Sequence, residues 1–242
     1  MKKVLILSGA GLSAESGIKT FRDHDGLWEN HDVMQVCSTE GWEEDRELVT
    51  QFYNKLRVGL ADKLPHAAHY LMARLEKAFP GQIYNLTQNV DDLLEKAGCE
   101  NVIHLHGTLV DLRCESCGDT WRIGYKQQDS DAFCPSCESI KVRHNVVMFG
   151  ESAPNYRYLY QALQESKLFV AIGTSGHVID IVELAKQVPY SILVNPKEEE
   201  YVTLFGGFEK NIDSFFSEFI QKGAVEATPD LEKRIRDFLE VA

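Results

Sequence analysis

Two Cys-x-x-Cys pairs are the clearest chemical feature of the sequence. Cys114 and Cys117 form the first pair, and Cys134 and Cys137 form the second after 16 intervening residues. Four thiolates at this spacing complete a tetrahedron around Zn²⁺ and leave no open coordination position, which is typical of a structural site. Unrelated reduced cysteines and a redox motif are the alternatives, but neither explains two such pairs together. The sequence therefore predicts one structural zinc ion per chain.

Two glycine-containing loops each follow a short apolar run. The first loop carries Gly9, Ala10 and Gly11, and the second begins at Gly173. Glycines allow the backbone to approach a pyrophosphate, and the N-terminus of a following helix favours its negative charge. Ala14 stands at the third glycine position of the dinucleotide fingerprint, which the fingerprint allows. Tight turns without a ligand are the alternative, but two such loops suit the two halves of a dinucleotide.

Polar side chains end two further apolar runs. Gln88, Asn89 and Asp91 follow one run, and His106 follows the other. A histidine with a nearby aspartate and asparagine can act as general base on a ribose hydroxyl or on an activated water. His104 lies two residues before His106, and we expect only one of the two histidines to be catalytic.

The hydrophobic pattern predicts the elements that must position these residues. Short apolar runs that alternate with helical patterns indicate an open parallel sheet, with ligands outside the carboxyl ends of its strands. The runs are Val4–Leu7, Ile83–Leu86, Val102–Ile103, Leu168–Ile172 and Ser191–Val194. An apolar stripe near the C-terminus predicts a helix that begins at Thr228 and Pro229.

Two regions interrupt this alternation and are interpreted as insertions. The predicted fold class is α/β, with a Rossmann-type parallel sheet and a smaller zinc-binding plus helical domain formed by the insertions. We assign residues 1–30, 80–109 and 145–242 to the Rossmann domain, which would bind the dinucleotide. Residues 31–79 would form the helical module of the small domain, and residues 110–144 the zinc-binding module.

The composition is ordinary for a soluble globular protein, with 242 residues, 44% of them hydrophobic and 26% charged. The net charge of −12 argues against a specific nucleic-acid partner, and the zinc-binding insert mixes basic with acidic residues. No signal peptide or transmembrane run is evident, so we expect a cytoplasmic protein with no membrane partner. We also expect a monomer.

Several segments together resemble the sirtuin family in order and spacing over essentially the whole chain. They are Gly9–Ile18, Thr20–Arg22, Thr87–Asp91, His106–Gly107, the four cysteines, Val147–Glu151 and Gly173–Ser175. The resemblance implies a Rossmann domain beside a small zinc-binding and helical domain, and NAD-dependent removal of acyl groups from protein lysines. In that chemistry the acyl oxygen attacks the nicotinamide ribose and nicotinamide leaves. The acyl group passes to ADP-ribose, which gives O-acyl-ADP-ribose and free lysine.

The resemblance also implies a role for each matching residue. His106 would be the general base on the ribose hydroxyl, Asn89 and Asp91 would shape the nicotinamide and ribose pocket, and Gln88 would contact ribose. Phe21 would shield the reacting ribose from released nicotinamide. The other residues expected along NAD are Gly9, Ala10, Gly11, Glu15, Arg22, Trp28, Gly173, Thr174, Ser175, Asn195 and Ala224.

The acyl group is less clearly determined. Tyr53 and its neighbours resemble bacterial desuccinylase-like sirtuins, whose Tyr-x-x-Arg pair binds a carboxylated acyl chain. Here Leu56 stands at the arginine position and Arg57 comes one residue later, about 100° further round a helix. Arg57 then either reaches the acyl pocket or is a solvated surface charge. His24 replaces a small residue and either narrows the pocket or contacts an acidic acyl group. Acetyl-lysine is therefore favoured, with succinyl and malonyl as alternatives.

The expected partners are acylated lysine side chains of proteins. An extended peptide would pair as a strand near Val147, Phe149 and Gly150, although a simple buried strand is the alternative there. Two other functions use the same pocket. One is mono-ADP-ribosyl transfer to protein, and the other is a non-catalytic module that binds NAD or ADP-ribose.

Overall fold

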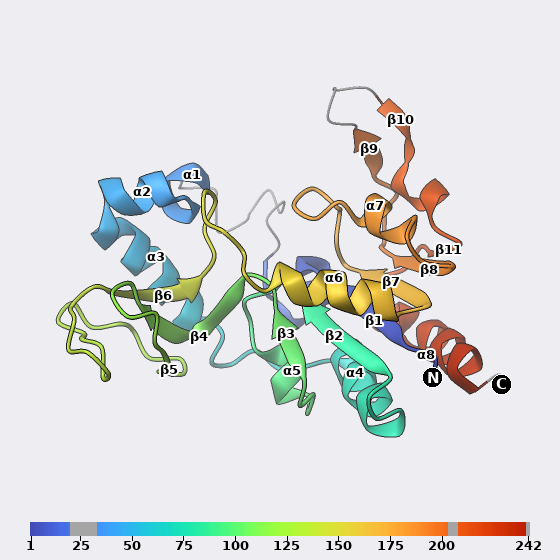
Figure 1. Cartoon of the computed structure of the whole chain (residues 1–242), viewed down its shortest axis with the longest axis horizontal. Helices are drawn as coiled ribbons and strands as arrows, with labels where there is room; N and C mark the ends of the chain where they lie inside the picture. Colours follow the sequence, from blue (N-terminus) through green and yellow to red (C-terminus); the bar gives the residue numbers. More distant parts are fainter. Residues whose placement is uncertain (20–32, 203–207, 241–242) are drawn as a thin grey trace.

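The computed structural model describes residues 1–19, 33–202 and 208–240, and its main element is a six-stranded parallel sheet. The strand order is β11-β8-β7-β1-β2-β3 (Figure 1). The strands are β1 (Val4–Ser8), β2 (Ile83–Thr87), β3 (Val102–His104), β7 (Leu168–Ile172), β8 (Tyr190–Val194) and β11 (Glu218–Ile220). Counted along the chain, this is the 3-2-1-4-5-6 order of a Rossmann sheet, so the predicted fold class is confirmed. Strand β11 is not predicted by the sequence pattern, because it is only three residues long and begins with a glutamate.

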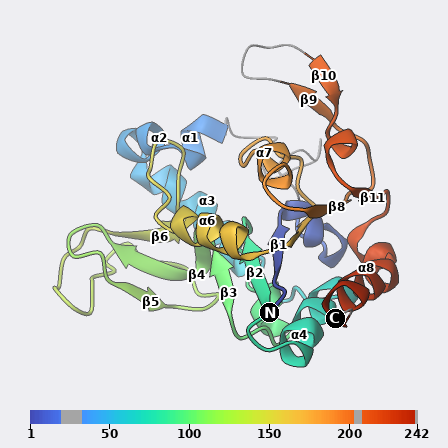
Figure 2. The same cartoon turned by 45° about the vertical axis from the view of Figure 1, so that its right-hand side comes forward.

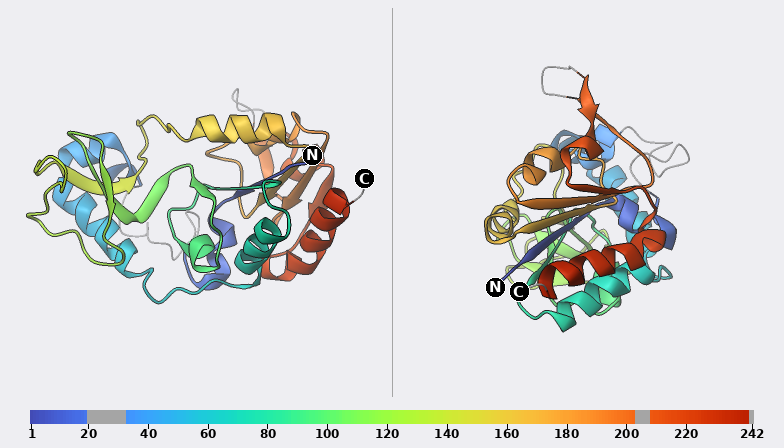
Figure 3. Two further views of the ribbon diagram at one scale, coloured as in Figure 1. Left: turned by 60° about the horizontal axis from the view of Figure 1, so that its bottom comes forward. Right: turned by 90° about the vertical axis from the view of Figure 1, so that its right-hand side faces the viewer.

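Helices cover both faces of this sheet (Figure 3). Val4 and Ile6 of β1 face α4 (Ala67–Ala78) and α8 (Ala224–Glu240) in one buried cluster. Leu5 and Leu7 face the other way, toward α6 (Tyr156–Glu165) and α7 (Ile181–Ala185). Apolar residues at successive positions of β1 therefore serve two cores, as expected for a strand buried on both faces.

The two insertions come together at one end of the molecule and form the small domain (Figure 1). The helical insertion supplies α1 (Val33–Cys37), α2 (Thr39–Glu44) and α3 (Arg46–Val58). The zinc-binding insertion forms an antiparallel sheet of order β5-β4-β6, made of β4 (Gly107–Cys114), β5 (Thr120–Arg122) and β6 (Val142–Val146). Trp42 and Phe52 of the helices share one buried cluster with Leu109 and Val146 of the sheet. The insertions therefore form a second unit, as the fold class predicts, but two of the expected bounds are wrong. Helix α4, which lies within the residues assigned to the helical module, packs in the core of the Rossmann domain, and β4 of the small domain already begins at Gly107.

The remaining elements are short. They are α5 (Leu93–Lys96), the antiparallel pair β9 (Glu200–Val202) and β10 (Phe208–Asn211), and the 3-10 helices η1 (Ala10–Leu12), η2 (Ala14–Ser16) and η3 (Ile212–Phe215). The β9–β10 pair projects from the Rossmann domain (Figure 2). Within the described ranges, no helix has the length and apolar character needed to cross a membrane.

The prediction that the last helix begins at Thr228 is wrong. Helix α8 begins one turn earlier, at Ala224, and contains Pro229. A carboxylate oxygen of Glu15 accepts a hydrogen bond from the backbone N–H of Val225 (2.9 Å), and the Thr228 hydroxyl donates to the carbonyl of Ala224 (3.0 Å). The first contact comes from the other end of the chain, so local sequence signals could not reveal this extra turn.

The loops that follow β1 and β7 meet where the strand order reverses. The N–H of Gly11 donates to the carbonyl of Gly173 (2.8 Å), and Gly173 has a φ of +64°. A Cβ atom on Gly173 would lie 2.2 Å from the backbone nitrogen of Leu12, and one on Gly9 would lie 2.8 Å from the carbonyl oxygen of Gly173. Both glycines are therefore required by the contact between the two loops, and Gly173 is required by its backbone conformation as well.

Replacing Gly173 by alanine should test this contact. Gly81 is the matched control, because its φ is +72° but nothing lies within 4 Å of a Cβ atom there. We expect Gly81→Ala to lower the free energy of unfolding by about 1–2 kcal/mol. Gly173→Ala should lower it by about 2–5 kcal/mol, since overpacking adds to the same backbone strain. Urea unfolding measures both, and equal losses would show that the loop contact is not tight.

Candidate active site and zinc centre

The four cysteines lie together between β4, β5 and β6. Their sulfur atoms are all within 4.8 Å of one another, with 3.6 Å between Cys114 and Cys137 and 3.7 Å between Cys117 and Cys134. A zinc ion with Zn–S bonds of about 2.3 Å would separate its ligands by about 3.8 Å in a tetrahedron. The four thiolates therefore fit a structural zinc ion, as the sequence predicts.

A buried network of charges connects this zinc-binding module to the helices. The guanidinium of Arg143 is fully buried, and its Nη2 pairs with the carboxylate of Glu151. Glu115, which lies inside the first cysteine pair, accepts a hydrogen bond from Nε1 of Trp42 (3.0 Å) and lies 3.5 Å from Nε of Arg143. A loss of zinc would therefore disturb the helical module as well as the cysteine loops.

The polar residues that end β2 gather around one buried hydroxyl. Ser13 accepts a hydrogen bond from Nδ2 of Asn89 (3.1 Å) and donates one to Oδ2 of Asp91 (2.9 Å). Nε2 of His69, a fully buried residue of α4, lies 3.5 Å from the same hydroxyl. Burial raises the pKa of Asp91, while the N–H of Leu93 and the Ser13 hydroxyl act in the opposite direction.

The sequence analysis missed two members of this group. Ser13 lies inside the first glycine-containing loop, so its place in the motif was a usable signal. His69 lies on an amphipathic helix among apolar residues, and nothing in its local sequence distinguishes it from a core position. Burial lowers the pKa of His69 to about 3, with the neighbouring His66 acting in the same direction. His69 is therefore a neutral hydrogen-bonding group at this site.

Two histidines, His104 at the end of β3 and His106 just beyond it, bind successive backbone carbonyls. Nδ1 of His106 lies 3.0 Å from the carbonyl oxygen of Gln88, and Nδ1 of His104 lies 2.8 Å from that of Asn89. A carbonyl can only accept, so both Nδ1 atoms carry a proton. Burial favours a lower pKa for His104, but the hydrogen bond and charge of Glu95 outweigh it and raise that pKa. Burial lowers the pKa of His106, against the effect of the Gln88 carbonyl.

Several other side chains expected along NAD are also brought together. Nε2 of Gln88 donates to the hydroxyl of Thr174 (3.1 Å), and Nδ2 of Asn195 donates to the carbonyl of Thr174 (2.8 Å). Glu15 reaches the start of α8 beside Ala224, through its hydrogen bond to Val225. The carboxyl edge of the sheet thus carries donors, acceptors and two glycine loops where the strand order reverses, which is where such sheets bind nucleotides.

A model of the Sir2 family matches residues 9–180. The chain belongs to the Sir2 family. A Campylobacter jejuni (strain RM1221) protein named NAD-dependent protein deacylase is 44% identical over 237 residues, covering 98% of this chain and 99% of that protein. A protein of the same name from Helicobacter hepaticus is 36% identical over 262 residues, covering 98% and 99%. The sirtuin resemblance seen in the sequence is confirmed.

Solved structures of sirtuins agree with this assignment. The complex of a mutant Sir2 homologue with ADP-ribose has a TM-score of 0.82 and 29% identity, covering 100% of this chain and 94% of that one. A Sir2 homologue in complex with NAD has a TM-score of 0.81 and 30% identity, covering 98% and 91%. The Rossmann domain and the small domain together are therefore the sirtuin fold.

Four residues expected in the sirtuin site lie outside the described residues. They are Phe21, Arg22, His24 and Trp28. Their expected roles stay predictions.

Two residues of α3 were expected to bind the acyl group, and both are buried. Arg57 is fully buried, where its Nε donates to the carbonyl of Leu109 and its Nη1 to Oδ1 of Asn54 (2.7 Å). The alternative that Arg57 is a solvated surface charge is therefore wrong, because these partners draw the guanidinium into the core. Tyr53 is stacked on His144 at 3.7 Å, and its hydroxyl lies 3.1 Å from Sγ of Cys37.

The segment expected to pair with a peptide is not a buried strand. Strand β6 ends at Val146, and the side chain of Phe149 is 43% exposed. Phe149 pairs instead with the helical module, since its N–H donates to Cys37 (2.8 Å) and its carbonyl accepts from Thr39 (3.0 Å). The N–H of Val147 is also bonded, to the carbonyl of His106 (2.9 Å), so a bound peptide would have to pair with the remaining backbone groups of this segment.

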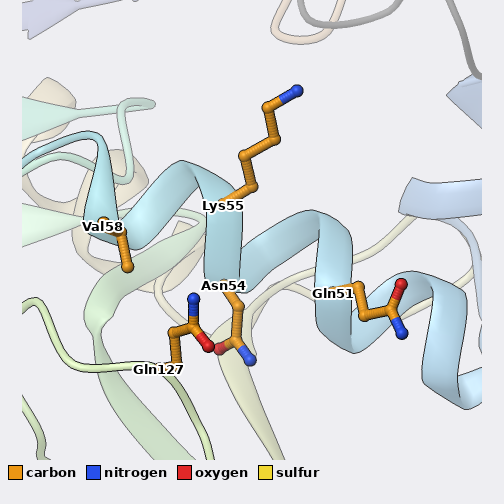
Figure 4. A pocket seen from close by; sticks show the side chains of 5 residues that line it. All are labelled: Gln51, Asn54, Lys55, Val58 and Gln127. Carbon is orange, nitrogen blue, oxygen red and sulfur yellow. The ribbon is translucent and has the colours of Figure 1, made fainter.

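A surface cavity on the small domain is separate from the polar residues at the strand ends. It has a volume of about 280 Å³ and lies between α3 and the zinc-binding module (Figure 4). Its lining residues are Gln51, Asn54, Lys55, Val58 and Gln127. None of them is one of the polar residues at the strand ends, so this cavity is not the candidate active site.

The zinc assignment predicts a simple difference between cysteines. Cys134→Ala should remove the metal and lower the thermal unfolding midpoint by roughly 5 °C or more, as a loss of about 2 kcal/mol would. Cys99 is the control, because it is a buried free cysteine outside the cluster. Cys99→Ala should keep one zinc per chain by elemental analysis. Equal zinc contents in the two variants would contradict the assignment.

Proposed function

We propose that this sirtuin removes acyl groups from lysine side chains of proteins in an NAD-dependent reaction. The products would be free lysine, nicotinamide and O-acyl-ADP-ribose. The observation that carries the proposal is the state of His106 at the carboxyl edge of the sheet. Its Nδ1 proton is held by the carbonyl of Gln88, so the lone pair of the neutral ring lies on Nε2. The deacylase names of the full-length relatives support the same reaction.

Each residue of the site has a role that follows from its chemistry. NAD would supply the ribose carbon that receives the acyl oxygen as nicotinamide leaves. His106 would take a proton from a ribose hydroxyl, which a neutral imidazole with a lowered pKa can do. Asn89 and Asp91, held by Ser13, would present fixed dipoles and a carboxyl group to the positive charge that develops on the ribose.

The acyl group that this pocket favours is acetyl, with succinyl and malonyl as weaker alternatives. Nε and Nη1 of Arg57 are already bonded to Leu109 and Asn54, which leaves only Nη2 without a partner among the described residues. Leu56, at the position of the arginine in desuccinylase-like sirtuins, is a partly buried apolar side chain. A carboxylated acyl chain would therefore find only Nη2 of Arg57 free to donate, and no charged group at Leu56.

The substrates would be acylated lysines of proteins. The acidic net charge of −12 is compatible with lysine-rich segments but does not select one. The monomeric state and the cytoplasmic location expected from the sequence stay predictions.

The reaction can be tested with acetyl-lysine peptides and NAD. We expect nicotinamide and deacetylated peptide to form in equal amounts, and His106→Ala to lower kcat/KM by about 10²–10⁴. The variant should keep its zinc and its unfolding midpoint, which shows that the loss is chemical. Release of nicotinamide without deacylated peptide would favour ADP-ribosyl transfer, and binding of NAD without turnover would favour a non-catalytic module.

The acyl preference can be tested by adding an arginine to α3. Wild-type protein should prefer acetyl- to succinyl-lysine peptides. Leu56→Arg should shift the ratio of their kcat/KM values toward succinyl by about 10-fold or more, as a charged hydrogen bond to the carboxylate would. Val58→Arg adds the same charge to the same helix at an exposed position and is the control. An equal shift in both variants would mean that the effect is one of net charge.

A further inference from the structure

His106, the proposed general base, has one contact with a residue that has not been given a role in the reaction. Nε2 of His106 lies 2.9 Å from the hydroxyl of Tyr156, the first residue of α6. The two rings are tilted by 44°, with their centroids 5.8 Å apart. Nδ1 of His106 must donate to Gln88, so the neutral ring can only accept at Nε2. The Tyr156 hydroxyl is therefore the donor of this bond.

The position of Tyr156 is fixed from both sides. Asn155 precedes it and donates from Nδ2 to the carbonyl of His104 (2.8 Å), which joins the start of α6 to the histidine segment. The aromatic ring of Tyr156 packs against the buried cluster under the sheet. The hydroxyl thus meets Nε2 through an anchored helix end and not through a mobile side chain.

The same nitrogen atom cannot serve two donors. Nε2 is the only atom of the neutral ring with a free lone pair, and under the proposed function it must accept the proton of a ribose hydroxyl. In this structure the Tyr156 hydroxyl already uses that lone pair. The Tyr156 hydroxyl is an O–H donor, as the ribose hydroxyl is.

We propose that Tyr156 is a positioning residue that occupies Nε2 of His106 in the NAD-free protein and yields it to the ribose hydroxyl when NAD binds. The bond keeps the imidazole oriented and its reactive nitrogen protected until a ribose hydroxyl replaces it. The inference rests on the proposed function, because the exchange needs a ribose hydroxyl at Nε2. Its first consequence, protection of Nε2, concerns the protein alone.

The protection can be measured without NAD or peptide. Diethyl pyrocarbonate transfers its ethoxycarbonyl group to an unprotonated imidazole nitrogen whose lone pair is accessible, and mass spectrometry locates the modified residue. We expect diethyl pyrocarbonate to modify His106 several-fold faster in the Tyr156→Phe variant than in the wild-type protein. Tyr160→Phe is the matched control, because Tyr160 lies one turn further along α6 and is 54% exposed. His104 is an internal reference, since both of its nitrogens are already hydrogen-bonded.

Steady-state kinetics test the exchange itself. Wild-type protein must break one hydrogen bond to bind ribose at Nε2, and Tyr156→Phe need not. The KM for NAD should therefore fall by about 2- to 10-fold in the variant, with kcat within about twofold. Equal rates of His106 modification in wild type and Tyr156→Phe would overturn the inference. So would a fall in kcat at unchanged KM, because Tyr156 would then act in the reaction.

The two proposals can fail separately. If wild-type protein deacylates no peptide but Tyr156→Phe exposes His106 to modification, the proposed function fails and the protection of Nε2 stands. If deacylation depends on His106 while the modification rates are equal, the role of Tyr156 fails and the proposed function stands.

Discussion

The contact between two backbone loops, Gly9–Gly11 and the loop at Gly173, is the constraint on which the rest of the site depends. The N–H of Gly11 binds the carbonyl of Gly173, and side chains at these glycines would overlap the opposite backbone. This close approach lies where the strand order reverses between β1 and β7, so the adjoining strand ends are held around it. Gln88 and Asn195 bind Thr174, one residue beyond the contact. A shift of either loop would therefore move both halves of the candidate NAD site.

A second constraint is that polar groups at this edge are buried or half-buried and must find partners. The hydroxyl of Ser13 is hydrogen-bonded to both Asn89 and Asp91. The backbone carbonyls of residues 88 and 89 accept hydrogen bonds from His106 and His104. Such shared bonds fix the orientation of every member, since a buried polar atom without a partner is costly. The groups that would act on a sugar are thus held in place by the protein's own hydrogen bonds, which is the condition for electrostatic stabilisation of a developing charge.

In the small domain the constraint is stability, because its zinc-binding module has little apolar core of its own. The buried cluster there contains Leu112 and Val142 together with two of the cysteines, and β5 is only three residues long. Four metal–thiolate bonds would replace the missing hydrophobic stabilisation. Buried Arg143 and the Glu115 carboxylate then join this module to the helices, so the metal would support the helical module as well. The cysteines would have no part in the reaction.

The sequence by itself determined the chemistry-bearing residues and the strands that carry them. Apolar runs predicted five of the six parallel strands, since the inner strands are buried on both faces and the edge strand β3 keeps two apolar residues. The zinc site was equally local, because each Cys-x-x-Cys pair is a single turn. The tertiary structure alone decided which distant groups meet: His69 beside Ser13, Glu15 at the start of α8, Arg57 within the core and Tyr156 on the general base. No local residue pattern encodes these contacts, because each joins two segments that are far apart in the sequence and meet only in the folded chain.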